Sequence, residues 1–555
     1  MKLDIASHQV LWNRLLAVVE EQGQALIRAA FSPIVRECGD ISAGVFDQQG
    51  RMLAQAVTGT PGHINTMAEA VLTLRDYIQP QNMKPGDIYT TNDPWIASGH
   101  LNDFLLLMPV FYRQRLVAFT ACTSHLVDLG GLGMGPEGSD IYDEGLLIPP
   151  CTLVQEGQIN ALLLDIIKAN SREPVANEGD IYALSACCET GARRLTGMMD
   201  EFALTELDSL ADYIINTSRN GCEQAIAQVP NGCYKSKLSI EGYESDIDLH
   251  ATLTVNDRDI HLDFTGTAPC SAKGINVPLN YAAAYSVFAM RCIIGAHIPN
   301  NAGSLGPFRV SAPAGCILNA QAPAPVAMRH TIGQLTPDLV YGCLHQALPE
   351  KVPAEGASCM YDLPLRSTPG ADISSAFALE LVFNGGTGAR PVKDGLSATA
   401  FPSGVWGSQV ETTESAAPVL IHRRELRIDS GGSGEFRGGL GQRIEIEPSD
   451  DNDILLFLSV ERIRYGAAGR NGGGEGAVGR IRLGEKAASL PGKGVVTIPA
   501  NTTLIFETPG GGGFGSAHRR KVSAIDADVS EGLISESAAR DTYPQWLAAG
   551  RRAKK

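Results

Sequence analysis

The chain has 555 residues, a formal net charge of −16 at pH 7 and a sequence pI near 5.2. This acidic balance argues against nucleic acid or an anionic membrane as the main partner, because both would repel the protein. Hydrophobic residues make up 44% and charged residues 19%, which is typical of a globular protein, and the length predicts two or three domains.

Residues 1–10 lack the apolar core of a signal peptide, and no stretch reaches the roughly 18 apolar residues of a membrane span. The sequence therefore predicts a cytoplasmic protein without a membrane anchor. Its 12 cysteines include no CxxC pair, so we expect reduced packing residues rather than a zinc ribbon or a disulfide framework.

The first elements alternate between helix and strand. Residues 4–31 carry apolar side chains at helical spacing and predict a long amphipathic helix. Residues 42–56 predict two short strands that turn at Gln49-Gly50. Residues 65–77 predict a second helix, with His63 at its start.

A β-hairpin is predicted next. Residues 104–111 and 116–123 are both apolar and β-prone, and residues 113–115 separate them. If these three residues form the loop, Tyr112 pairs with Leu116 in an antiparallel register.

The same register brings Asp103 opposite His125 on one face, about 5 Å apart at Cβ, and His100 could close the group. Two imidazoles and a carboxylate suit Zn²⁺, Mn²⁺ or Fe²⁺, and so few protein ligands leave positions open for catalysis. A one-residue slip would put Asp103 and His125 on opposite faces. In the alternative interpretation, His100 caps a turn, Asp103 bonds to the backbone and His125 is a buried core histidine.

Two further residues are candidates for the site. Asp40 precedes the first strand and is a candidate fourth ligand. Three roles are open for His63, namely a helix cap, a ligand or a substrate contact, and we favour a residue that lines the pocket.

Residues 130–138 are rich in glycine. They lack the Lys-Ser/Thr of a phosphate-binding P-loop, so a mobile loop near the metal is preferred to a phosphate cradle. Residues 181–218 have a helical pattern, which changes to strand and turn around Asn220-Gly221 and Asn231-Gly232. This change predicts a domain boundary near residue 220.

Strands are predicted over 232–264 and a helix over 280–295. The carboxyl half contains glycine clusters between β-prone runs, which indicates tight β-turns in an all-β element. The predicted fold is therefore a mixed, multi-domain α+β architecture. Its parts are a metal-site α/β domain (1–220), an α+β domain (221–380) and a β-rich glycine-turn domain with a C-terminal helical tail (381–555).

Over nearly its whole length the chain resembles the hydantoinase B family, which includes subunits of N-methylhydantoinase, 5-oxoprolinase, caprolactamase and acetone carboxylase. The motifs that carry the resemblance follow one another in order: Arg36-Glu-Cys-Gly-Asp-Ile-Ser42, Asn92-Asp-Pro, Gly99-His-Leu-Asn-Asp103, Ser124-His125, Asn170-Ser-Arg172, Gly179-Asp180, Asp263-Phe-Thr-Gly266, Asn276-Val-Pro278, Pro299-Asn-Asn-Ala-Gly303, Pro323-Ala-Pro-Val326, Arg437-Gly-Gly439 and Thr508-Pro-Gly-Gly-Gly-Gly-Phe-Gly515.

The resemblance implies a divalent metal on Asp40, His100, Asp103 and His125, the last three being the stronger ligands. Four other family positions would line or support the pocket: His63, Asp93, Asn170 and Arg172. One departure is the segment 462–466, which lacks the proline expected in the family.

The resemblance also implies that ATP binds to a partner, the hydantoinase A-type ATPase subunit, in an α2β2 hetero-oligomer. ATP would activate the carbonyl of a small cyclic amide, and the metal would assist attack by water. His63 or a metal-bound hydroxide would then act as the base, with Asp40 a candidate only if it is not a ligand.

Three functions stay open at this point. The preferred one is the metal-bearing subunit of an ATP-dependent hydantoinase, oxoprolinase or lactamase. The second is a subunit of an acetone- or acetophenone-type carboxylase, and the third is a non-catalytic scaffold for the partner.

Overall fold

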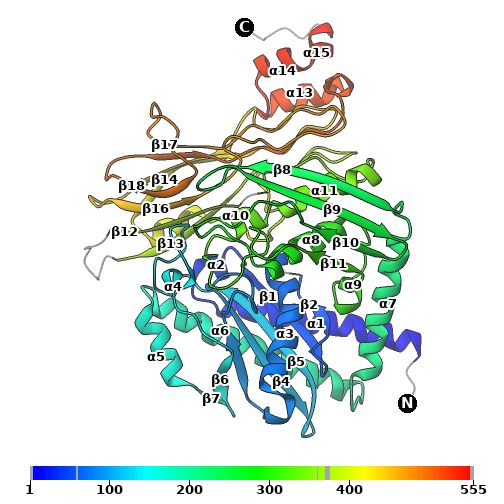
Figure 1. Ribbon diagram of the computed structural model, residues 1–555. Helices are drawn as coiled ribbons and strands as arrows, with labels where there is room; N and C mark the ends of the chain where they lie inside the picture. Colours follow the sequence, from blue (N-terminus) through cyan, green and yellow to red (C-terminus); the bar gives the residue numbers. More distant parts are fainter. Residues whose placement is uncertain (1–3, 58–59, 359, 369–375, 550–555) are drawn as a thin grey trace.

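The computed structural model describes residues 4–57, 60–358, 360–368 and 376–549 (Figure 1). Within them, three large hydrophobic cores follow one another along the chain, built mainly from residues 11–215, 222–352 and 361–506. Helices and several sheets are mixed, as the α+β, multi-domain prediction requires. The domain boundaries themselves stay a prediction, and residues 1–3 and 550–555 of the predicted termini lie outside the described residues.

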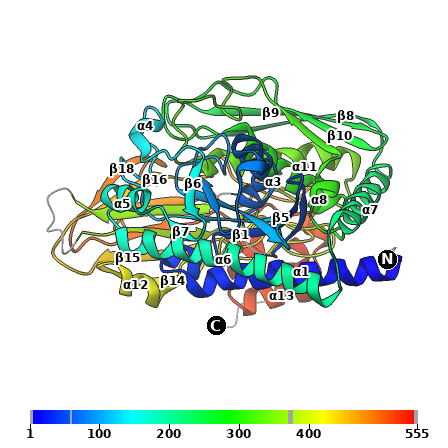
Figure 2. The same cartoon turned by 90° about the horizontal axis from the view of Figure 1, so that it is seen from below.

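The first core contains a seven-stranded sheet in the order β2-β1-β5-β4-β3-β6-β7. Its strands are β1 (Ile41–Asp47), β2 (Met52–Gln55), β3 (Ile88–Thr91), β4 (Asp103–Tyr112), β5 (Arg115–His125), β6 (Cys151–Gln155) and β7 (Gln158–Ile159). Helices α1 (Ile5–Ala29) and α6 (Pro174–Glu201) pack side by side against one face (Figure 2), and α3 (Pro61–Ile78) covers the other. Burial on both faces explains the almost unbroken apolar runs of β4 and β5.

The first elements match their predictions closely. Helix α1 begins where the side chain of Asp4 accepts a hydrogen bond from the backbone N–H of Ser7. The turn between β1 and β2 includes Gly50, whose φ is +81°. Helix α3 begins at Pro61, four residues before the predicted start, so His63 lies within its first turn.

The hairpin loop differs by one residue from its prediction. Tyr112 pairs with Arg115 and not with Leu116, which leaves a two-residue loop of Arg113 and Gln114. Both loop residues have positive φ, 48° and 66°. This is the backbone of a type I′ turn, whose twist matches that of the two strands.

An irregularity in β4 then restores the predicted register. The pairing shifts by one residue between Val110 and Phe111, as in a β-bulge. From there to the strand ends the pairs are those expected, and Asp103 lies directly opposite His125. The central structural prediction of the site is therefore confirmed, although the predicted turn was wrong.

The predicted helical region 181–218 consists of two helices, α6 and α7 (Asp208–Ile226). The turn expected at Asn220-Gly221 was wrong, because α7 continues through it. Its buried face carries Ile214, Cys222 and Ile226, and this packing outweighs the low helix propensity of glycine.

The second core contains a four-stranded sheet in the order β11-β10-β9-β8. Its strands are β8 (Gly232–Ile240), β9 (Ile247–Asn256), β10 (Asp259–Asp263) and β11 (Phe308–Ser311). Helices α8 (Leu279–Ile293) and α11 (Thr336–Ala347) share its core. The predicted strands over 232–264 and the helix over 280–295 are both present.

The third core lies between two four-stranded sheets. One sheet contains β12 (Met360–Ser367), β13 (Ala378–Asn384), β16 (Ile454–Ser459) and β18 (Lys493–Ile498). The other contains β14 (Val419–Leu426), β15 (Gln442–Pro448), β17 (Arg480–Leu483) and β19 (Leu504–Glu507). The chain ends in a small helical group of α13 (Val522–Ser530), α14 (Glu536–Thr542) and α15 (Pro544–Ala548), at the top of Figure 1.

Many glycines of this region are not in tight turns, which corrects the prediction. Gly386, Gly438, Gly439 and Gly511 all lack positive φ and lie in extended segments that stack backbone against backbone. The N–H of Gly511 donates to the carbonyl of Gly439, and the N–H of Gly439 donates to that of Thr387, at 3.0 and 2.9 Å. Glycine is needed here because the neighbouring backbones leave no room for a Cβ atom.

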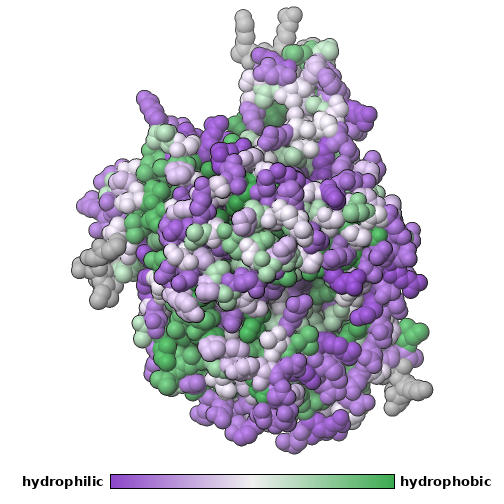
Figure 3. Space-filling view, viewed as in Figure 1, coloured by the Kyte–Doolittle hydropathy of each residue, from purple (hydrophilic) through white to green (hydrophobic). Residues whose placement is uncertain are grey.

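The surface adds two observations. Figure 3 shows hydrophobic side chains gathered over α5 (Ala161–Asn170), where Leu162 is 71% and Ile166 41% exposed. Such a patch is typical of a contact surface with another chain. Within the described ranges no helix has the length and apolar character needed to span a membrane, and every cysteine is a free thiol.

Candidate metal centre

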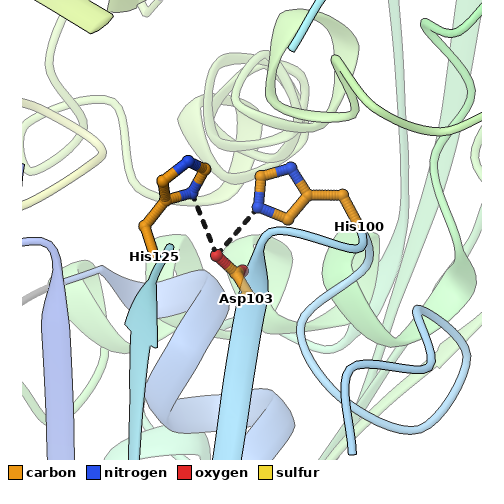
Figure 4. Close-up of side chains that lie close together, drawn as sticks. All are labelled: His100, Asp103 and His125. Atoms are coloured by element: carbon orange, nitrogen blue, oxygen red, sulfur yellow. Dashed lines mark hydrogen bonds and ion pairs between the residues drawn. The ribbon is translucent and has the colours of Figure 1, made fainter. Parts of the chain in front are cut away.

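Three side chains meet at the end of the central hairpin (Figure 4). Asp103 is the first residue of β4 and His125 the last of β5, while His100 extends from the preceding loop. Asp103 Oδ1 lies 2.8 Å from His100 Nε2 and 3.4 Å from His125 Nδ1. One ligand atom from each residue lies within 4.8 Å of the others, and all three residues are buried. The structure therefore brings together the three candidate ligands that the sequence predicted, His100, Asp103 and His125, which we call the metal cluster.

In His100 and His125, the ring nitrogen that points away from Asp103 also has a hydrogen-bond partner. Nδ1 of His100 lies 3.0 Å from the carbonyl oxygen of Ala327, which can only accept a hydrogen bond. Nε2 of His125 lies 3.1 Å from Oε1 of Glu380. Each ring thus lies between two acceptors, as in metal sites where groups behind the ligating histidines orient them.

The two histidines differ in protonation: burial lowers the pKa of His125, but Glu380 and Asp103 outweigh this and raise it well above its usual range, whereas His100 favours a cation. Burial, with the nearby Arg329, lowers the pKa of His100 to about 4, so the ring is neutral near pH 7. A neutral imidazole has one N–H, and the Ala327 carbonyl takes it. Nε2 of His100 therefore points a lone pair at the Asp103 carboxylate, and a cation between them fits both donors.

The contacts of its second oxygen, Oδ2, keep Asp103 ionised. Oδ2 accepts an ion-pair hydrogen bond from Arg329 and lies 3.0 Å from Nε2 of His63. Burial raises the pKa of Asp103, but Arg329, His100 and His63 together hold it well below its usual range. The Arg329 guanidinium is itself stacked over the ring of Tyr281, at 4.2 Å from its centroid.

Asp40 and His63 line the same cavity, but Asp40 does not belong to the three-residue cluster. Its Oδ1 accepts a hydrogen bond from Thr60 at 2.8 Å and lies 3.5 Å from Nδ1 of His63. Burial lowers the pKa of His63, yet Asp103 and Asp40 outweigh this and raise it. The role of Asp40 as a ligand stays a prediction.

The opposite wall contains residues that sequence reasoning missed: His330, Asp362 and Glu380. Nε2 of His330 lies 3.8 Å from Oδ2 of Asp362. Burial and the neighbouring Glu380 raise the pKa of Asp362 well above its ordinary value, which favours the protonated carboxyl. Burial and Arg329 lower the pKa of His330, so this ring is neutral.

The other positions suggested by the resemblance lie outside this cavity. Asp93 accepts a hydrogen bond from the backbone N–H of Trp95 in the loop that carries His100. Asn170 ends α5, and Arg172 pairs with Asp128 beside a neighbouring cavity. In the segment 462–466, Arg462 has a φ of +58° and pairs with buried Asp338.

The free space beside the metal cluster is about 20 Å³, enough for an ion or one water molecule.

Replacing Glu380 by Gln is expected to weaken metal binding by about 10- to 100-fold, because the carboxylate that orients His125 is lost. A competitive titration with a chromophoric chelator measures this affinity. The matched control is Glu447→Gln, since Glu447 makes the same type of contact, at 2.9 Å, with the half-exposed His422. Equal affinities of the wild type and Glu380→Gln would exclude this role for Glu380.

Glu144 provides a prediction on stability. Its Oε1 accepts a hydrogen bond from the backbone N–H of Ala327, and burial raises its pKa from 4.5 to about 8. The folded state therefore binds a proton that the unfolded state loses, and this contribution to stability falls as pH rises from about 4.5 to about 8. We expect Tm to fall less steeply with pH in Glu144→Gln than in the wild type, and the two proteins to have the same Tm near pH 4.5. Parallel profiles of Tm against pH would contradict this.

Comparison with known proteins extends these observations. The family model described as Hydantoinase B/oxoprolinase matches residues 4–517. The B subunit of a putative D-/L-hydantoinase from Pseudomonas sp. (strain NS671) is 26% identical, over 98% of this chain and 95% of its own length. The beta subunit of the caprolactamase from Pseudomonas jessenii is 29% identical, over 96% of this chain and 94% of its own.

Solved structures have the same fold. The ATP-dependent caprolactamase from Pseudomonas jessenii matches with a TM-score of 0.89 and 26% identity, over 100% of this chain and 98% of that one. An acetone carboxylase structure matches with a TM-score of 0.86 over 96% of this chain and 79% of that one. At 18% identity, this second likeness concerns the fold alone.

Proposed function

Because the chain belongs to the hydantoinase B/oxoprolinase family, we propose that it is the metal-bearing subunit of an ATP-dependent enzyme that opens a small cyclic amide. The observation that carries this proposal is the buried cluster of His100, Asp103 and His125 at the edge of a cavity. Relatives named hydantoinase and caprolactamase support the same class of reaction.

The partner in this proposal is a hydantoinase A-type ATPase subunit, in an α2β2 complex. Two relatives are named as single subunits of larger enzymes, which supports a partner, and one related structure is called ATP-dependent. The exposed apolar surface over α5 is a suitable contact area for such a chain.

The three ligands would hold a divalent ion such as Zn²⁺, Mn²⁺ or Fe²⁺. When bound, the ion would supply Lewis acidity, which polarises a carbonyl and favours ionisation of water. Arg329 keeps Asp103 ionised for this task, and Ala327 and Glu380 fix the two imidazoles. The protein thus supplies a preorganised donor set.

His63 and Asp362 would move the protons of ring opening. Nδ1 of His63 makes no hydrogen bond within the described chain, and it faces Asp40, so a proton taken from the attacking water would be stabilised there. As water adds to the carbonyl and the C–N bond breaks, the ring nitrogen needs a proton. Asp362, protonated on the opposite wall, would supply it.

The test is hydrolysis of cyclic amides by the chain together with its A-type partner. 5-Oxoproline, hydantoins and lactams are incubated with and without ATP, and the ring-opened products are measured by mass spectrometry. The proposal predicts product that requires ATP, both chains and the metal. Product formation that is unaffected by the loss of His100 and His125 would contradict it.

A carboxylase component is the second candidate, which the fold likeness to acetone carboxylase favours. The same assay distinguishes the two, because a carboxylase consumes ATP only with a ketone and bicarbonate. Ring opening is preferred since the relatives at 26–29% identity are named for cyclic amides.

A further inference from the structure

The cavity beside His100 and His125 is called the metal cavity here. A second cavity adjoins it and contains two arginines, Arg172 and Arg366. The two cavities share Met134 and Glu380 in their walls. The side chains of Met134 and Glu380 therefore separate the two cavities.

Strand β12 connects the two cavities directly. Side chains alternate along a strand, so Asp362, Pro364 and Arg366 share one face. Asp362 lines the metal cavity, Arg366 lines the second cavity, and Pro364 between them pairs with Glu380 on β13. Four residues of strand span roughly 13 Å, so this face runs from the metal cavity to the arginine.

The two arginines differ in how their charges are balanced. Arg172 forms a salt bridge with the buried Asp128. Arg366 stacks on Phe457, at 4.6 Å from the ring centroid, and donates to the carbonyl of Leu132 at 3.2 Å. Among the described residues it has no carboxylate partner. A partly buried cation beside a second cation is stabilised when an anion binds to it.

The glycine-rich loop of residues 130–138 forms the other wall. A Cβ atom on Gly135 would lie 2.8 Å from the Phe457 ring, and one on Gly130 would lie 2.6 Å from the carbonyl oxygen of Asn170. Glycine therefore allows the loop to lie flat on the ring that supports Arg366. Close packing therefore explains these glycines, and no phosphate-binding P-loop is needed to account for them.

The two cavities differ in which of their charged groups are paired. In the metal cavity, the carboxylates of Asp103 and Glu380 face Arg329 and His125. In the second cavity, Asp128 pairs with Arg172, and Arg366 has no carboxylate partner within the described ranges. A substrate with a polar amide at one end and an oxyanion at the other fits this division.

We propose that Arg366 binds an oxyanion of the substrate, a carboxylate or a phosphate, while the amide group reaches the metal cluster. This inference rests on the proposed function and specifies its substrate class. The carboxylate would belong to the ring compound itself, whereas the phosphate would belong to its ATP-activated form. A guanidinium recognises both groups through paired N–H donors.

The test measures the Tm of the purified full chain with sodium phosphate, sodium acetate or sodium chloride at equal ionic strength. Phenanthroline removes metal, so that anions do not bind to it. Phosphate or acetate is expected to raise Tm by about 2 to 4 °C over chloride at concentrations well above Kd. The shift is expected to disappear in Arg366→Gln, to persist in part in Arg366→Lys, and to remain whole in Arg423→Gln, a half-exposed arginine on β14.

A Tm shift with acetate identifies the oxyanion bound by Arg366 as a carboxylate of the substrate. A shift with phosphate alone identifies it as the phosphate of the ATP-activated substrate. No shift in the wild type, or an equal shift in Arg366→Gln, would overturn the inference. This readout needs neither metal nor turnover, so it separates failure of this inference from failure of the proposed function. In the active complex, Arg366→Gln is expected to raise KM about tenfold for rings that carry the anion, with little change for neutral lactams.

Discussion

Replacing His100 or His125 by alanine is expected to lower the rate of ATP-dependent ring opening by about a thousand-fold or more. A metal supplies several kcal/mol of stabilisation to such a transition state, and each 1.36 kcal/mol is worth about a factor of ten. Each histidine contributes one of three ligand atoms, and its ring is oriented by Ala327 or Glu380.

The matched control for this experiment is His422→Ala. His422 also contacts a carboxylate, Glu447, but its side chain is 41% exposed and belongs to β14 in the third core. Steady-state assays of the complex give the rates, and circular dichroism verifies folding of every variant. Full activity with metal retained in His100→Ala or His125→Ala would refute the catalytic assignment.

The second large effect concerns the stacked glycines. Gly511→Ala is expected to destabilise the third core by several kcal/mol, at or beyond the upper end of the roughly 1–3 kcal/mol typical of overpacking. A Cβ on Gly511 would lie 2.0 Å from the carbonyl oxygen of Thr387 and 2.3 Å from its carbonyl carbon. Both are backbone atoms in a hydrogen-bonded stack, so neither can move aside as a flexible side chain would.

Gly197→Ala provides the control for this substitution. Gly197 is exposed within α6, and apart from its own helix backbone no atom of the described chain lies within 4 Å of an added Cβ. Alanine there is expected to stabilise the helix by up to about 1 kcal/mol. Urea denaturation monitored by circular dichroism compares the two variants. Similar midpoints for Gly511→Ala and the wild type would show that the stack tolerates side chains.

The hairpin part of the site could be predicted because it depends on local rules. Strand side chains alternate with a period of two, so the apolar runs around residues 104–123 determine which residues face one another. The loop was misjudged by one residue, since Arg113 and Gln114 adopt positive φ without glycine or asparagine. The shift at Val110 cancelled that error, and no sequence rule anticipates such a bulge.

The rest of the site depends on long-range packing. Arg329 reaches Asp103 across 226 residues of sequence, and Glu380 reaches His125 across 255. Their neighbours in the chain give no periodic or motif signal that connects them with the hairpin. Such contacts become visible only when the second and third cores are assembled against the first.

The glycine clusters show a different limit. Their composition suggests turns, because glycine is the usual residue where φ is positive. In the stack of Gly386, Gly438 and Gly511, glycine is required instead by the close approach of backbones. Sequence alone does not distinguish these two uses, since both leave the same residue type.

Metal analysis by mass spectrometry of the purified chain, alone and with its partner, tests the central claim most directly. About one divalent ion per chain is expected in the wild type and in His422→Ala, and almost none in His125→Ala. The wild type without metal, even in the complex, would contradict the account and leave a scaffold role in its place.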